Sequence, residues 1–139
     1  MSGGTPYSSP AQAHLQRIAV GSHTGYDRLV LSFGTDAVPP FTVTPQDSAT
    51  FKADPSDETV ALAGTSGIRV VVRDTVRATT TSENLLPRFP AIRQVRDVGD
   101  FEAVVTYAVG TAGTSPSIRV TTLSAPNRLV IDVAWPDPA

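Results

Sequence analysis

Two short stretches of this chain repeat nearly the same alternating pattern. Tyr26–Phe33 and Asn127–Val133 share an Arg-Leu-Val-aliphatic core, with Arg28 and Arg128 lying 100 positions apart. Successive side chains of a β-strand point to opposite faces, so each stretch gathers one apolar triplet on a single face. The two triplets are Leu29, Leu31 and Phe33, and Leu129, Ile131 and Val133. The pattern predicts two half-buried strands whose apolar faces lie in the core and whose opposite faces carry the arginines.

The rest of the chain favours an all-β fold over an α/β fold. Val and Thr are abundant, and these β-branched residues favour pleated, half-buried surfaces. The 12 Pro and 10 Gly indicate many turns. About eight or nine short strands, with turn signals every 8 to 12 residues, predict a β-sandwich of two small sheets. A single helical turn is expected near residues 82–86, where Pro87 and Pro90 would end it.

Turn signals place the expected hairpins. Gly64–Gly67 is predicted to join strands at 59–63 and 68–74, and Gly99-Asp100 to join strands at 91–98 and 101–109. Residues 118–123 and 128–134 form the predicted closing hairpin, and the first strand is expected over 14–20. In this scheme residues 1–13 are a flexible tether, 14–135 a single domain and 136–139 a tail.

Composition excludes several classes of protein. A net charge of −2 and a pI near 5.5 argue against a general nucleic-acid binder. The chain has no Cys, which excludes a disulfide framework, a thiolate zinc site and a Cys nucleophile. No run of about 18 apolar residues occurs, so no membrane span is expected. The first residues lack a signal-peptide pattern, which leaves open a signal peptide or lipid anchor upstream of residue 1.

The sequence offers few candidates for catalysis. The two histidines, His14 and His23, do not form a zinc-binding spacing, and no Gly-x-Ser-x-Gly motif is present. We therefore expect no metal, no cofactor and no catalytic set. One alternative pairs His23 with Asp27 as acid and base, with a carboxylate such as Glu102 completing a hydrolase site. The competing interpretation is that His23 caps a loop or hydrogen-bonds a strand end.

Charged and aromatic residues give further candidates for binding. The arginines at 88, 93 and 96 could meet an anionic polymer through bidentate contacts, but the interspersed Asp97 and Asp100 favour a self-paired, solvated edge. Asp100 is expected to shape a turn and Glu102 to pair with a nearby arginine, because one turn does not make the cleft of a glycosidase. Three aromatic residues could stack on sugars, of which Tyr107 is expected in the core: Tyr26, Tyr107 and Trp135.

Four blocks of sequence, in a fixed order, carry a resemblance to a known family. They are His23–Phe33, Leu86–Val95, Gly99–Val104, and Ile118–Val120 together with Pro126–Asp132. Their order and spacing resemble the AMIN-like domain of actinobacterial cell-envelope proteins, often lipoproteins, over roughly residues 15–134. The chain departs from the family at Ala103, where Gly is expected, and in a shortened region after Gly110.

The resemblance implies a two-sheet β-sandwich and a non-catalytic role. The related AMIN domains target cell-wall amidases and secretion proteins to the envelope, with peptidoglycan as the suspected ligand. Motif membership, without an established role, extends to His23, Gly25, Asp27, Arg28, Asp100, Glu102, Arg128 and Asp132.

These observations predict an extracytoplasmic binding or localisation module for peptidoglycan or for an envelope protein. The alternative is a protein–protein scaffold that uses an exposed strand edge, and the hydrolase hypothesis is the least favoured. Neither the oligomeric state nor the binding face follows from the strand pattern. The candidate ligand-binding residues are His23, Tyr26, Asp27, Arg28, Asp100, Glu102, Arg128 and Trp135.

Overall fold

The computed structural model describes residues 1–4, 12–34, 36–77 and 83–136, and these residues contain strands but no helix. The all-β prediction is confirmed, although the described residues form fourteen strands where eight or nine were expected. None of the described elements is a helix that could span a membrane. The strands are β1 (Ser2–Gly3), β2 (Ala13–Leu15), β3 (Arg17–Ser22), β4 (Tyr26–Gly34), β5 (Phe41–Gln46), β6 (Thr50–Lys52), β7 (Thr59–Ala61), β8 (Ser66–Val72), β9 (Thr75–Arg77), β10 (Asn84–Leu85), β11 (Ile92–Phe101), β12 (Val104–Thr111), β13 (Ile118–Leu123) and β14 (Asn127–Ala134).

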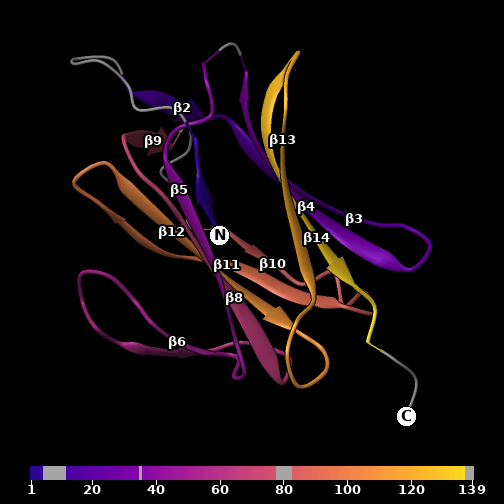
Figure 1. Ribbon diagram of the computed structural model, residues 1–139. Coiled ribbons are helices and arrows are strands. Elements are labelled where there is room, and N and C mark those ends of the chain that lie inside the picture. The colour runs from indigo at the N-terminus through magenta and orange to yellow at the C-terminus, as the bar shows by residue number, and fades with distance from the viewer. Residues whose placement is uncertain (5–11, 35, 78–82, 137–139) are drawn as a thin grey trace.

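Two main sheets enclose the core (Figure 1). The large sheet has the order β1-β5-β8-β12-β11-β10, and the small sheet has the order β13-β14-β4-β3. Two ribbons, a parallel β2-β9 pair and an antiparallel β6-β7 pair, complete the fold. The inner faces of both main sheets contribute to one continuous hydrophobic cluster, as expected for a sandwich.

The two repeated stretches are neighbours in the small sheet. β4 and β14 pair antiparallel, with Leu29 opposite Ile131 and Leu31 opposite Leu129. Both predicted apolar triplets are buried in the core, so this prediction is confirmed. The predicted closing hairpin is also confirmed, because β13 pairs with β14.

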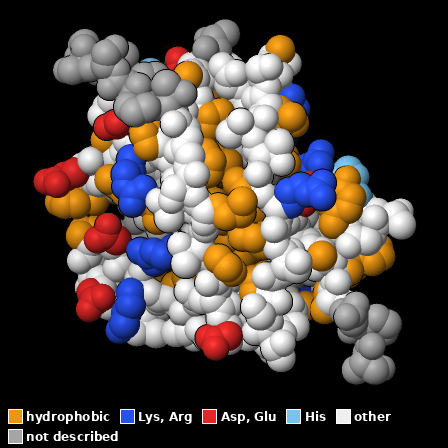
Figure 2. All heavy atoms as spheres, in the orientation of Figure 1, with side chains coloured by type: hydrophobic (Ala, Val, Ile, Leu, Met, Phe, Trp, Pro, Cys, Tyr) orange, Lys and Arg blue, Asp and Glu red, His pale blue; other side chains and the backbone are white. Residues whose placement is uncertain are grey.

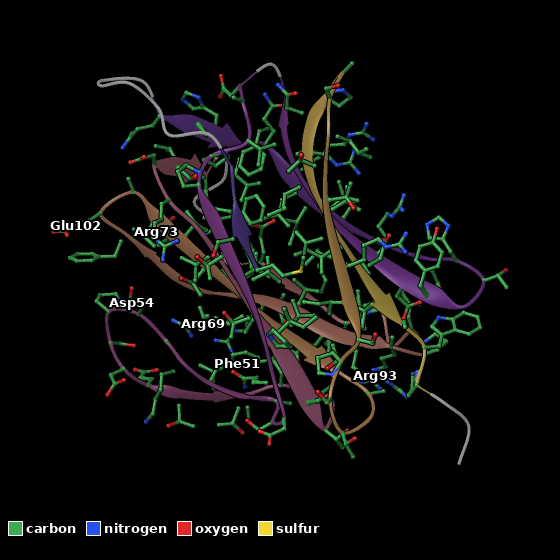
Figure 3. All side chains as sticks on the ribbon, in the orientation of Figure 1. Phe51, Asp54, Arg69, Arg73, Arg93 and Glu102 are labelled. Carbon is green, nitrogen blue, oxygen red and sulfur yellow. The ribbon has the colours of Figure 1, made fainter. Side chains whose placement is uncertain are left out.

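The outer face of the large sheet is partly covered by the β6–β7 ribbon. Phe51 and Val60 of the ribbon form a second apolar cluster with Ala108 of β12. A Cβ on Gly67 of β8 would come within 2.6 Å of the Phe51 ring, so glycine allows this close approach. Phe51 is labelled in Figure 3, at the lower left part of the molecule. The β6–β7 ribbon therefore removes part of this face from solvent.

The predicted hairpin across Gly64–Gly67 is wrong. β7 pairs with β6, whereas β8 pairs with β5 and β12. The glycines serve close packing instead of a tight turn: a Cβ on Gly64 would lie 2.5 Å from the carbonyl oxygen of Thr111. A Gly-rich four-residue stretch could not distinguish these two uses.

The turn predicted at Gly99-Asp100 is also wrong. β11 continues to Phe101, and the chain reverses at Glu102 and Ala103, whose φ angles are 52° and 62°. Positive φ at both central residues is the geometry that two-residue hairpins prefer. Gly99 instead follows an irregularity in the β11–β12 register and bridges to Asp54.

The ends of several predicted segments also differ. Asn84 and Leu85 form β10 against β11, where a helical turn was expected over 82–86, so strand pairing overrides the local propensity.

Residues 78–82 lie outside the described residues, as do 5–11 of the predicted tether and 137–139 of the predicted tail. Within the tether, Ser2–Gly3 pairs with β5. The predicted first strand divides into β2, which pairs with β9, and β3, which joins the small sheet.

Candidate functional site

The outer face of the small sheet carries a row of polar side chains. Arg28 of β4 lies directly opposite Asp132 of β14, and Asp132 lies opposite Arg119 of β13. On the other side of Arg28, Gly21 of β3 is its cross-strand neighbour. Directly opposed residues project from the same face of a sheet, so the row combines two arginines with one carboxylate beside a position that has no side chain.

Arg28 and Asp132 form a two-point contact. Nε of Arg28 donates to Oδ1 of Asp132 at 2.7 Å, and Nη2 donates to Oδ2 at 3.1 Å. This paired geometry fixes the plane of the guanidinium as well as its position. The hydrogen bond from Arg28 to Asp132 raises the pKa of Arg28 above its ordinary value, and partial burial opposes this effect only in part.

Two aromatic rings continue this arrangement at the start of β4. The His23 and Tyr26 rings stack with centroids 4.9 Å apart and an interplanar angle of 9°. The guanidinium carbon of Arg28 lies 5.5 Å from the centroid of the Tyr26 ring, within cation–π range. Arg28 is therefore held by Asp132 on one side and by Tyr26 on the other.

A surface pocket of about 410 Å³ lies beside the Arg28 side chain and is lined by Tyr26, Arg28, Ser117, Ile118, Arg119, Asp132 and Ala134. A second depression, of about 570 Å³, shares Ser117 and Ala134 with this pocket and extends to Trp135 and Pro136. Figure 2 shows basic side chains beside a histidine on the right of the molecule, where the small sheet lies in Figure 1. The pocket and the depression together form a continuous polar and aromatic surface.

Asp27 points to the opposite face of β4 and is fully buried. Its Oδ1 accepts hydrogen bonds from the Ser22 hydroxyl at 2.6 Å and from the Trp135 indole at 2.9 Å. Its Oδ2 accepts from the backbone N–H groups of Ala91 and Ile92, at 2.6 Å and 2.9 Å. Burial alone would raise the pKa of Asp27, but the four hydrogen bonds outweigh it and hold the pKa below its ordinary value.

This geometry does not support an acid–base pair of His23 and Asp27. Asp27 is buried and already accepts four hydrogen bonds, so it is not placed to receive a proton from a substrate. His23 is exposed, and its ring stacks on Tyr26. Asp27 instead connects β4, the start of β11 and the residue after β14.

The remaining sequence-predicted residues fall into two groups. Arg128 shares the outer face of the small sheet with Arg28 but donates to the carbonyl oxygens of Pro126 and Ser124 in its own turn. Asp100 and Glu102 lie at the β11–β12 hairpin of the large sheet, outside the pocket. Asp100 is an ion-pair partner of Arg77 at 3.6 Å, whereas the expected pairing was between Glu102 and an arginine. Glu102 is labelled at the far left of Figure 3.

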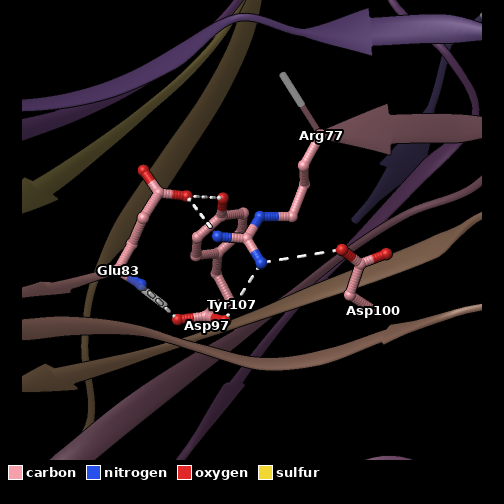
Figure 4. A network of polar contacts seen from close by, with 5 residues as sticks. All are labelled: Arg77, Glu83, Asp97, Asp100 and Tyr107. Atoms are coloured by element: carbon pink, nitrogen blue, oxygen red, sulfur yellow. Dashed lines mark hydrogen bonds and ion pairs between the residues drawn. The ribbon is translucent and has the colours of Figure 1, made fainter. Parts of the chain in front are cut away.

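Figure 4 shows a second polar cluster, which was not predicted from the sequence. Arg77 is only 5% exposed and contacts Glu83 and Asp97 at 3.1 Å each. The hydroxyl of the buried Tyr107 donates to Glu83 at 2.5 Å. Burial and the Glu83 carboxylate raise the pKa of Tyr107. The expectation that Tyr107 is a core residue is confirmed, but no local motif links these four positions.

The described part of the chain contains no group of three or more His, Cys, Asp or Glu side chains placed to hold a metal ion. The described candidate residues offer hydrogen-bonding, stacking and ion-pairing groups. These are the interactions by which a surface recognises a polar or sugar-containing ligand.

Comparison with known proteins identifies a family but no individual relative. Searches of curated proteins and of solved structures found no match. The AMIN-like domain matches residues 13–135, which include both main sheets apart from β1. The chain therefore belongs to the AMIN-like domain family.

Proposed function

We propose that this domain is a non-catalytic, extracytoplasmic binding and localisation module for peptidoglycan, and that it contacts the cell wall through the outer face of the small sheet. Membership of the AMIN-like family supports the class of function, since these domains are generally non-catalytic modules outside the cytoplasm. In this proposal an upstream signal peptide or lipid anchor holds the domain at the envelope.

The observation that carries the proposal is the preassembled pocket around Arg28. Asp132 and Tyr26 hold the guanidinium in place before any ligand arrives, which lowers the entropic cost of binding. The outer face of the large sheet, in contrast, is partly covered by the β6–β7 ribbon. The small sheet thus presents the more open and more organised surface.

The groups of this surface suit a glycan that carries short peptides. The 37% exposed Trp135 offers a flat ring face to the apolar face of a sugar, and the Tyr26 ring, which already stacks on His23, holds the Arg28 guanidinium beside it. Arg119 is exposed, and no described carboxylate lies within ion-pair distance of it, so it is available to a carboxylate of the ligand. Asp132 and Arg28 supply an acceptor and donors for hydroxyl and amide groups.

Sedimentation with purified sacculi tests this function. The wild-type domain should co-sediment, and the double variant Tyr26→Ala/Arg119→Gln should remain largely in the supernatant. Arg73→Gln is the matched control, because it removes the same charge from the residue that follows β8 on the large sheet. Absence of wild-type co-sedimentation above that of an unrelated β-sandwich would contradict the proposal.

A second candidate, docking to an envelope protein, is favoured by one observation. β13 ends the small sheet, and no described strand pairs with its other edge. Its six residues contain no Pro and a single charge, Arg119, so this edge lacks two common protections against strand addition. Cross-linking to a partner that is lost in Thr122→Lys, together with no affinity for sacculi, would favour this candidate over the first.

A further inference from the structure

A third depression, at one end of the sandwich, carries two arginines. It has a volume of about 430 Å³ and is lined by Ala63, Gly64, Thr65, Arg88, Arg93, Ala112 and Gly113. Figure 3 places Arg93 at the lower right, well away from Arg69 and Arg73. We call this depression the Arg88–Arg93 pocket.

The two arginines are not neutralised by the described carboxylates. Asp97 and Asp100, which the sequence suggested as partners of this arginine-rich stretch, contact Arg77 instead. No other described Asp or Glu lies within 4.0 Å of the Arg88 or Arg93 guanidinium. The pocket therefore has a net positive charge, although the whole chain has a formal charge of −2.

The backbone directs both side chains in unusual ways. Arg93 is the extra residue of a bulge, because Ile92 and Gln94 of β11 lie opposite the consecutive residues Thr111 and Gly110. Bulges reorient a side chain relative to its neighbours in a strand. Arg88 has a φ of 54°, a left-handed conformation that few residues other than glycine adopt.

Hydrogen bonds fix the walls of the pocket before any ligand binds. The Ala63 N–H donates to Oε1 of Gln94 at 2.8 Å, and the Thr65 hydroxyl donates to the carbonyl oxygen of Gly113 at 2.6 Å. The Ala112 N–H donates to the carbonyl oxygen of Ala91 at 2.9 Å. A rigid wall of this kind lowers the cost of ordering the site around a ligand.

The Arg88–Arg93 pocket is continuous with the surface described above. It shares Ala112 and Gly113 with the depression at Trp135, and that depression shares Ser117 and Ala134 with the pocket around Arg28. Asp27 connects two of these three depressions. Its side chain accepts hydrogen bonds from Trp135, which lines the middle depression, and from the N–H groups of Ala91 and Ile92, next to Arg93. One extended ligand can follow this path.

We infer that the Arg88–Arg93 pocket binds the carboxylate of a short peptide attached to the polymer that occupies this path. Two guanidinium groups match the two oxygens of a carboxylate and give charge-assisted hydrogen bonds. The identity of the polymer rests on the proposed function, whereas the oxyanion pocket rests on the geometry of Arg88 and Arg93. A phosphate group has the same donor requirements, so the test distinguishes the two sources.

The first experiment is an NMR titration with three small probes. Acetyl-alanyl-alanine with a free carboxylate should shift the backbone amide signals of Thr65, Arg93 and Gly113. Its C-terminal amide should bind about tenfold more weakly, the effect of losing one charge-assisted hydrogen bond. Tighter binding of glycerol phosphate than of the dipeptide would overturn the carboxylate assignment, and no shift with any probe would overturn the oxyanion pocket.

The second experiment uses the variants Arg93→Gln and Arg88→Asn, since Asn tolerates the left-handed conformation at position 88. Each should weaken dipeptide binding about tenfold, whereas the control Arg73→Gln should leave it unchanged. Unfolding curves matching those of the wild type would show that the variants are folded. If the wild type binds sacculi and both variants bind equally well, the inference fails and the proposed function stands. If the dipeptide binds but sacculi do not, the proposed function fails and the pocket stands.

Discussion

The carboxylate of Asp27 accepts a hydrogen bond from the indole of Trp135 at 2.9 Å, across 108 positions of the sequence. The same carboxylate accepts from the backbone N–H groups of Ala91 and Ile92, where β11 of the opposite sheet begins. One buried side chain thus connects the small sheet, the large sheet and the residue after the last strand. Asp27 is best understood as a positioning residue for the surface that Trp135 and Arg93 share.

Replacing Asp27 should destabilise the whole domain. In Asp27→Asn an NH2 group replaces one carboxylate oxygen, and each of these oxygens accepts from two donors, so at least one buried donor loses its acceptor. We expect the free energy of unfolding to fall by about 2–4 kcal/mol. Urea denaturation measures this change. Asp47→Asn, an exposed substitution of the same kind, should change it by less than about 0.5 kcal/mol, and equal effects would contradict the buried role of Asp27.

The Asp27 carboxylate should also make the stability of the domain depend on pH. The folded pKa of Asp27 is lower than the ordinary value of 3.8, so the unfolded state binds more protons between these two pKa values. The contribution of Asp27 to stability is therefore complete above about pH 5 and is lost as the pH falls through the folded pKa. Denaturation at a series of acidic pH values should show the difference between wild type and Asp27→Asn shrinking as the pH decreases. A constant difference would contradict a lowered pKa.

A substitution in the hairpin at Glu102-Ala103 should stabilise the domain. Ala103 has a φ of 62°, where an L-residue with a Cβ is strained and where the family resemblance suggests glycine. Ala103→Gly should raise the free energy of unfolding by about 0.5–1 kcal/mol, the relief of strain less the extra entropy of the unfolded chain. In the control Ala61→Gly, within strand β7, stability should fall by about 0.5–1 kcal/mol. Thermal unfolding of both variants compares them directly.

Tyr107 should not ionise while the domain is folded. Burial and the neighbouring Glu83 carboxylate raise its pKa. In a spectrophotometric titration up to about pH 11, Tyr107→Phe should leave the rise in tyrosinate absorbance of the folded domain unchanged. Loss of absorbance in Tyr107→Phe, with the fold intact, would show that the hydroxyl is accessible.

Period-2 patterns predicted the parts of this fold that depend on local alternation. Leu29, Leu31 and Phe33, and their counterparts in β14, are buried as predicted, because a strand with one apolar face has a single favourable orientation. The pairing of β7 with β6 was not predictable, because strand partners depend on contacts between segments far apart in the chain. The turn at Glu102-Ala103 was missed because neither residue is a typical left-handed residue, whereas Gly99-Asp100 looked like a turn.

The candidate site was likewise predicted only in part from the sequence. Arg28 was predicted on the outer face, but its partner Asp132 became evident only when β4 and β14 were seen to be neighbours. Asp27 was predicted as a ligand-binding residue, and the structure buries it, since the alternation that exposes Arg28 turns the preceding side chain inward. Arg77 and Glu83 carried no signal, because the Arg77–Glu83–Asp97 cluster joins three separate segments.

Replacing Tyr26 should weaken binding to sacculi while changing the stability of the domain only slightly. Its ring is half-buried, stacks on His23 and lies beside the Arg28 guanidinium, so its removal exposes the pocket without leaving a buried cavity. Tyr26→Ala should weaken co-sedimentation with sacculi about tenfold, the effect of losing one aromatic contact and a cation–π partner. Its free energy of unfolding should fall by only about 1 kcal/mol. Thr121→Ala, on the same outer face but outside the pocket, should leave co-sedimentation unchanged. If the two variants bind sacculi equally, the contact surface is not the pocket around Arg28.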